Sequence, residues 1–102
     1  MDYKKFREHT ELHSPEEILE DNGYNPEELG ENGTIILRHF DFSTAIVGVS
    51  DDDRVIYDYE KMIEYLVNYE DMDAEEAIDY ISYNFSFPMG GDKKWPVIMY
   101  SF

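Results

Sequence analysis

The spacing of apolar residues predicts two consecutive helices between residues 59 and 84. In the first helix, apolar residues recur every three or four positions, as on one face of a helix: Tyr59, Met62, Ile63, Leu66 and Val67. The second helix repeats this spacing in its own apolar residues: Ala74, Ala77, Ile78 and Ile81. Its start is marked by Asp73 and Glu76, which have the spacing of a capping box.

The pattern before these helices is typical of strands. Three runs are rich in β-branched and aromatic residues: TIILRHFDF from Thr34, TAIVGVS from Thr44 and RVIYDY from Arg54. Because the connections between them are short and polar, the runs predict an antiparallel meander. Gly48 inside the second run predicts a bulge or a close packing contact. A final run, WPVIMYSF from Trp95, predicts a last strand.

The first 33 residues are polar and contain two helix-start signatures. Ser14-Pro15 precedes Glu17, and Asn25-Pro26 precedes Glu28, which favours a helix near 15–22 and one turn near 26–29. We expect this acidic segment, 1–33, to pack loosely on an α+β core, 34–102. The whole chain, 1–102, is then a single α+β domain in which an antiparallel sheet of three to four strands packs against two main helices.

Negative charge is the strongest feature of the composition. The 102 residues include 24 Asp and Glu against eight Lys and Arg, a net charge of −16. Residues 51–80 hold 12 of these acids, and their cations are Arg54 and Lys61. Self-repulsion at this charge opposes compaction, although an acidic surface also keeps a protein soluble. Nucleic acid is disfavoured as a direct ligand, because no basic surface is available to displace counterions from phosphates.

Part of this charge follows from ordinary helix design. Acids at a helix N-terminus are favoured by the helix dipole, which accounts for Asp58, Glu60, Asp73, Glu75 and Glu76. Elsewhere, carboxylates one helical turn apart are separated by about 6 Å, comparable with the close spacing of phosphates on nucleic acid. A fixed array of such groups, with tyrosines as anchors, could occupy the basic groove of another protein. The predicted partner-binding residues are Asp51, Asp52, Asp53, Glu64, Tyr65, Tyr69, Glu70, Asp71, Glu75, Glu76, Asp79 and Tyr80.

A simpler interpretation remains open at this stage. The acids could form an ordinary solvated face, and two or three of the tyrosines could cover the edge of the core with their hydroxyls in water. The two interpretations differ in whether the carboxylates are displayed outward for a partner.

Catalytic and metal motifs are absent from the sequence. The acids after Asp51 and after Asp71 do not have the EF-hand spacing. In HTELH, His9 and His13 lack the Glu directly after the first His that zinc proteases require. With no cysteine and no serine-nucleophile motif, we expect no enzyme, no cofactor and no metal. No apolar run reaches membrane-spanning length, and we expect a soluble cytoplasmic protein.

Residues 44–101 resemble a family of small acidic proteins encoded by prophages and other mobile elements of Gram-positive bacteria. The chain departs from the family pattern at Asp52-Asp53, where the family has Asp-Gly. The matching residues are Ala45, Gly48, Val49, Arg54, Tyr57, Asp58, Tyr59, Lys61, Met62, Glu75, Glu76, Ala77, Ile81, Tyr83, Asn84, Pro96, Ile98, Met99 and Tyr100.

The resemblance implies an anti-defence protein in a bacterial host cell. Its expected partner is a basic nucleic-acid-binding protein, most of all a type II CRISPR nuclease, whose DNA engagement it would block as a nucleic-acid mimic. The alternative is a mobile-element accessory protein that binds a basic regulator, toxin or restriction enzyme without mimicry.

Overall fold

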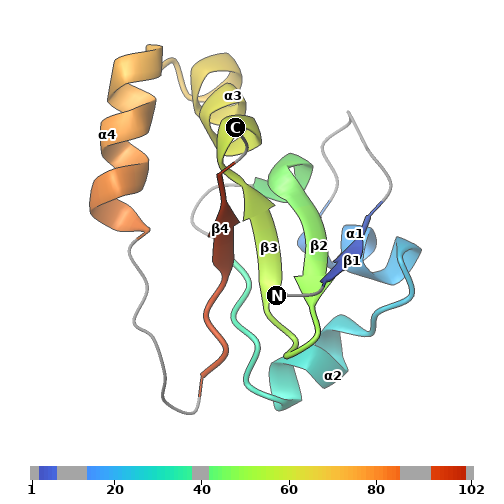
Figure 1. The fold of residues 1–102 in the computed structure, drawn as a ribbon. Coiled ribbons are helices and arrows are strands. Elements are labelled where there is room, and N and C mark those ends of the chain that lie inside the picture. The colour runs from blue at the N-terminus through green and yellow to red at the C-terminus, as the bar shows by residue number, and fades with distance from the viewer. Residues whose placement is uncertain (1–2, 7–13, 38–41, 86–92, 101–102) are drawn as a thin grey trace.

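The fold is built on a mixed sheet of four strands in the order β1-β2-β3-β4 (Figure 1). The computed structural model describes residues 3–6, 14–37, 42–85 and 93–100. The strands are β1 (Tyr3–Lys5), β2 (Ile46–Ser50), β3 (Val55–Asp58) and β4 (Val97–Met99). The first three strands are antiparallel neighbours, whereas β4 runs parallel to β3. The α+β class is therefore confirmed, but the purely antiparallel sheet is wrong.

The parallel pair follows from the connection between its strands. After β3 the chain forms α3 (Tyr59–Tyr69) and α4 (Ala74–Asn84) before it returns to the sheet as β4. Such a long crossover allows the chain to re-enter the sheet at the end where β3 began, which a tight hairpin does not. The two helices were expected at these positions, and both are confirmed.

The sheet edge next to β2 differs from the prediction. The predicted strand starting at Thr34 is wrong over 34–37, where Thr34 makes only an isolated bridge with Lys94. At the other end of that run, Phe42 begins a short 3-10 helix, η1 (Phe42–Ala45), and 38–41, including His39, lie outside the described residues. The place beside β2 is taken by β1. The predicted bulge is confirmed by a register shift between Ile46 and Gly48.

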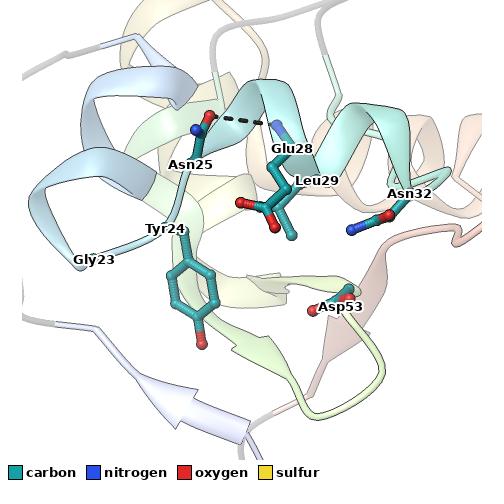
Figure 2. Close-up of a pocket in the computed structure, with 7 residues that line it drawn as sticks. All are labelled: Gly23, Tyr24, Asn25, Glu28, Leu29, Asn32 and Asp53. Atoms are coloured by element: carbon teal, nitrogen blue, oxygen red, sulfur yellow. Dashed lines mark hydrogen bonds between the residues drawn. The ribbon is translucent and has the colours of Figure 1, made fainter.

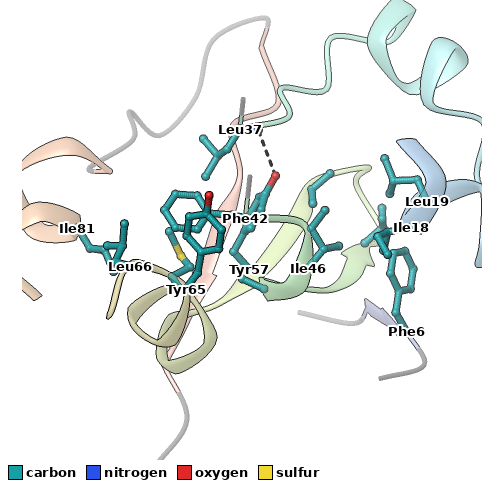
Figure 3. Packing of buried hydrophobic residues seen from close by; sticks show 14 of the residues in the cluster. Phe6, Ile18, Leu19, Leu37, Phe42, Ile46, Tyr57, Tyr65, Leu66 and Ile81 are labelled. Atoms are coloured by element: carbon teal, nitrogen blue, oxygen red, sulfur yellow. Dashed lines mark hydrogen bonds between the residues drawn. The ribbon is translucent and has the colours of Figure 1, made fainter. Parts of the chain in front are cut away.

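The two N-terminal helices contribute side chains to the core. They are α1 (Pro15–Asp21) and α2 (Pro26–Glu31), so the second is longer than the predicted turn. Ile18 and Leu19 of α1 are buried together with Phe6 and Ile46 in the main hydrophobic cluster (Figure 3). The expected loose packing of these two helices is therefore wrong, whereas 1–2 and 7–13 lie outside the described residues.

The centre of the core lies between β3, η1 and α3. Phe42 makes edge contacts with Tyr65 and Phe85, at ring-centroid distances of 5.3 and 5.5 Å. Tyr57 is fully buried, and its hydroxyl accepts a hydrogen bond from the backbone N–H of Leu37 at 3.1 Å. α3 thus lies against the end of the sheet.

α4 is the most peripheral helix. It packs on the outer side of α3 (Figure 1) and buries only Ala77 and Ile81. Its N-terminus is fixed by Asp73, whose Oδ1 accepts the N–H of Glu76 at 2.8 Å. Most of its circumference is consequently exposed to solvent.

Candidate functional site

The predicted acidic residues lie on two separate parts of the molecule. The turn 51–53 joins β2 to β3 at the end of the sheet beside α2, whereas α3 begins at the opposite end of β3 (Figure 1). The carboxylates of this turn and those of α3 and α4 therefore do not form one continuous array.

The turn acids are largely committed to interactions within the chain. Arg54 Nε lies 2.9 Å from Asp52 Oδ2, and Asp52 Oδ1 accepts a hydrogen bond from the Ser50 hydroxyl. Lys94 Nζ lies 3.4 Å from Asp53 Oδ2. Asp51 is exposed and has no such partner among the described residues. Asp52 and Asp53, which were predicted to bind a partner, therefore already have cationic partners within the chain.

The same contacts set the protonation of Asp52. The hydrogen bond from Ser50, and then the hydrogen bond and charge of Arg54, hold the pKa of Asp52 below its ordinary value of 3.8, against the opposing effect of burial. The backbone of the turn is also anchored, since Thr34 Oγ1 donates to the carbonyl of Asp53 at 2.7 Å. The turn acts mainly as a structural element that ties residues 34 and 94 to the hairpin.

Most acids on α3 and α4, unlike Asp52 and Asp53, have no partner among the described residues. Residues 59–84 contain eight carboxylates and one lysine, Lys61. Six of these acids are exposed and form no side-chain hydrogen bond or ion pair with any described residue. We call this group the α3–α4 acidic surface, and its members are Glu60, Glu64, Asp71, Glu75, Glu76 and Asp79. All but Glu60 were predicted as partner-binding residues.

The predicted tyrosine anchors divide into buried and exposed ones. Tyr65 is only 7% exposed, and its hydroxyl donates to Glu70 Oε1 at 3.2 Å. Tyr65 therefore belongs to the core and cannot serve as a surface anchor, and Glu70 is its partner. Tyr80 is half-buried and packs near Phe85, with ring centroids 6.0 Å apart.

Two exposed tyrosines remain beside the acids. Tyr69 is 54% exposed and stacks on Tyr65 with ring centroids 5.3 Å apart. Tyr83 is 87% exposed, although it was not among the predicted anchors. The sequence signal for Tyr83 is its spacing, because Glu75, Asp79 and Tyr83 follow one another at intervals of four along α4.

The outer face of α4 therefore combines negative charge with apolar area. Glu75, Asp79 and Tyr83 lie on the side opposite to the buried Ala77 and Ile81. Ile78 of the same helix adds an exposed apolar side chain, at 42% exposure, and Val67 is an exposed apolar residue of α3, at 38%. Charge bordered by exposed aromatic and aliphatic groups is typical of a macromolecular contact surface.

The end of α3 carries acids at positions that disfavour them locally. Glu70 is the C-cap residue, and Asp71 follows it with a φ of 55°, in the left-handed region where Gly is preferred. A helix C-terminus bears partial negative charge, so both carboxylates are electrostatically unfavourable there. The chain thus places exposed charge at this corner at a cost to its own stability.

The described residues contain no group of three His, Cys, Asp or Glu side chains that could hold a metal ion. His9 and His13, at which we expect no metal site, lie outside the described residues. Within the described part of the chain, no helix has the length and apolar character needed to cross a membrane.

Comparison with known proteins adds no identification. No protein family, curated protein or solved structure matches this chain.

Proposed function

We propose that this protein is an inhibitory binding protein whose α3–α4 acidic surface occupies a cationic, nucleic-acid-binding surface of another protein. The observation that carries the proposal is the lack of internal counterions: the six surface carboxylates are exposed and unpaired among the described residues. Carboxylates left free in this way can pair with arginines and lysines of a partner. No bond needs to be broken within the protein to expose them.

The expected affinity comes from many weak contacts acting together. An exposed ion pair contributes only about 0.2–1 kcal/mol, so two or three of them do not make a stable complex. Tyr69 and Tyr83 can add larger contributions, because tyrosine supplies contact area at low entropic cost. The arrangement on α4, with acids followed by an exposed ring, suits a basic groove that also offers apolar contact.

The target class that we propose is an RNA-guided nuclease of the type II CRISPR systems. Such a nuclease holds nucleic acid in a positively charged channel and reads a short duplex motif with arginines. Helix carboxylates about 6 Å apart can neutralise those arginines in place of phosphates. The resemblance of residues 44–101 to mobile-element proteins favours a target in host defence.

One observation favours a second candidate function. Ile78 and Val67 are exposed apolar residues on the same two helices as the acids. A groove that binds phosphates offers them few apolar contacts. They fit better with an accessory protein that binds a basic regulator, toxin or restriction enzyme without imitating nucleic acid.

A competition experiment tests the proposal. A type II nuclease loaded with guide RNA is assayed for DNA cleavage with increasing amounts of this protein. We expect inhibition that weakens as more DNA is added and as the salt concentration rises, because both compete for the same cations. Binding that is unaffected by excess DNA would favour the accessory function. If the nuclease neither binds the protein nor is inhibited by it, the proposed target is wrong.

A further inference from the structure

The cavity between α2 and the turn 51–53 lacks the features of a binding site (Figure 2). Its volume is about 190 Å³, and its two acids come from different elements. Glu28 is exposed, and Asp53 is already paired with Lys94. No described residue that lines the cavity has a buried side-chain polar atom without a hydrogen bond. The exposed apolar residues of α3 give stronger evidence of a contact.

α3 has apolar residues beyond those that it buries in the core. Tyr59, Ile63 and Val67 follow one another at intervals of four, so they form a line along one side of the helix. Tyr59 and Ile63 are half-buried, whereas Val67 is exposed. The line is about 12 Å long, since each residue of a helix rises by about 1.5 Å.

Tyr100 extends this line at the start of α3. β3 and β4 are parallel and end side by side, with Asp58 opposite Met99 (Figure 1), so the residue after β4 reaches the residue after β3. The Tyr100 ring lies against the Tyr59 ring, with the ring centroids 4.6 Å apart, and the Tyr100 side chain is 55% exposed. We call this group the α3 apolar strip, and its members are Tyr59, Ile63, Val67 and Tyr100.

Acids border the strip along one side of α3. Glu60 and Glu64 each lie three residues before a member of the strip, so on the helix they neighbour Ile63 and Val67. Both carboxylates are exposed and form no side-chain hydrogen bond or ion pair with a described residue. An apolar contact surface with unpaired anions along its border fits a partner whose apolar side chains are flanked by lysines or arginines.

The form of the strip favours a helix as the partner's contacting element. Side chains one turn apart form a ridge, and such ridges pack into the grooves of another helix. A helix also brings its backbone N–H and C=O groups already bonded. An extended segment laid on α3 would leave its own groups without partners, because the α3 backbone is bonded internally. A second copy of this chain is disfavoured, since it would bring together two molecules of net charge −16.

We propose that the α3 apolar strip binds an amphipathic basic helix of the partner protein. The apolar side of that helix packs on the strip, and its lysines or arginines pair with Glu60 and Glu64. The inference rests on the proposed function, because these two acids belong to the α3–α4 acidic surface, and it specifies the structural element of the partner that is bound. It also gives the exposed Val67 a role in binding.

Two synthetic peptides of the same composition test whether a helix is required. Both contain leucine and lysine in equal numbers and have about 18 residues, enough for about five helical turns. In one peptide the leucines recur every three or four positions, as on one face of a helix, and in the other they alternate with the lysines, as in a strand. Each is titrated into the isotope-labelled protein and followed by NMR. The helical peptide should bind about tenfold more tightly than the alternating one and should shift the amides of Ile63, Val67 and Tyr100.

Matched variants locate the contact. Val67→Ser removes an exposed apolar side chain from the strip with little change in helix propensity, and it should weaken binding of the helical peptide about fivefold. Tyr100→Ser should weaken it at least as much, because an aromatic ring is lost. The control is Asn68→Ser, at the next exposed position of the same helix but outside the strip, and it should change binding by less than about twofold.

Each other outcome refutes a different statement. Equal binding of the two peptides, no binding of the helical one, or equal effects of Val67→Ser and Asn68→Ser would overturn the inference and leave the proposed function dependent on charge alone. Self-association of the protein that Val67→Ser abolishes would assign the strip to a second copy and refute a basic helix. A nuclease that is not bound, together with a helical peptide that is, would refute the proposed target and keep the basic helix as the bound element.

Discussion

Two aspartates with the same unusual backbone conformation have opposite roles. Asp53 has a φ of 63° and Asp71 a φ of 55°, both in the left-handed region. Asp53 is held by Lys94 and by the bond from Thr34 to its carbonyl, so its conformation is supported by neighbours. Asp71 is exposed, and its side chain has no partner among the described residues. A residue in an unfavourable backbone conformation that no contact within the fold compensates is a candidate for a functional role.

This contrast gives a prediction for Asp71→Gly. Glycine adopts the left-handed conformation freely and removes a negative charge from the C-terminal end of α3, so the free energy of unfolding should rise by about 1 kcal/mol. Binding to the cationic partner should weaken at the same time. Urea unfolding and a binding assay on the same samples check both effects. Asp53→Gly is the control, because it relieves a similar conformation but loses the contact to Lys94. A loss of stability in Asp71→Gly would show that the residue is structural.

The lowered pKa of Asp52 gives a prediction about acid. Because the folded-state pKa lies below 3.8, the ionised carboxylate stabilises the fold above that pH, and its contribution is lost as the pH falls through the lowered pKa. The side chain is 57% exposed, so the contribution at neutral pH should be under about 1 kcal/mol. Asp52→Asn should therefore be less stable than the wild type at pH 7, and the difference should shrink as the pH falls through the lowered pKa of Asp52.

Chemical denaturation at several pH values measures this difference. Asp51→Asn, which removes a neighbouring carboxylate without an internal partner, should show no comparable pH-dependent gap. A gap for Asp52→Asn that stays constant down to low pH would mean that the contacts with Ser50 and Arg54 do not depend on its charge.

At the scale of elements, α4 is held by few residues. Its buried side chains are Ala77 and Ile81, against α3, so truncation of Ile81 removes most of the apolar anchoring. We predict that Ile81→Ala lowers the free energy of unfolding by about 2–4 kcal/mol. The control is Ile78→Ala on the same helix, where the side chain is 42% exposed and the loss should stay below about 1 kcal/mol. Comparable losses in urea unfolding would mean that α4 packs through a different face.

The elements that the sequence predicted are those with local signals. Both main helices follow from apolar spacing and from the caps Asp58 and Asp73, which involve residues within one turn. β1 escaped prediction because a three-residue strand in a polar segment is defined by its partner β2 rather than by its own pattern. The run from Thr34 has strand-forming residues, but the place beside β2 is filled, and its β propensity is overridden.

In the candidate site, too, local contacts could be predicted from the sequence and long-range contacts could not. Within residues 59–84, where Lys61 is the only cation, six of the eight carboxylates form no side-chain hydrogen bond or ion pair with a described residue, whereas Glu70 and Asp73 accept hydrogen bonds. The engagement of Asp53 could not be foreseen, since Lys94 lies 41 residues away in sequence. The burial of Tyr65 could have been found, because Tyr65 is three residues from Met62 and shares its buried face.

At the scale of the whole molecule, which has a net charge of −16, some acids are paired with internal cations and others are not. The turn acids Asp52 and Asp53 are neutralised within the chain by Arg54 and Lys94. The acids of α3 and α4 have no such compensation among the described residues, so they repel one another and destabilise the free protein. A cationic partner would remove that repulsion. If net charge alone drives binding, variants of equal charge should bind a partner equally. If the α3–α4 acidic surface drives it, only variants changed within that surface should bind more weakly.

The most direct test compares two triple variants that remove three negative charges each. One neutralises the α3–α4 acidic surface through Glu64→Gln, Glu75→Gln and Asp79→Asn. The other neutralises exposed acids elsewhere through Glu20→Gln, Glu27→Gln and Asp51→Asn. If the surface makes the contact, the dissociation constant for the nuclease rises by about tenfold or more in the first variant and by less than about threefold in the second. Equal changes in the two variants would contradict the account, since charge in general and not the α3–α4 acidic surface would then drive binding.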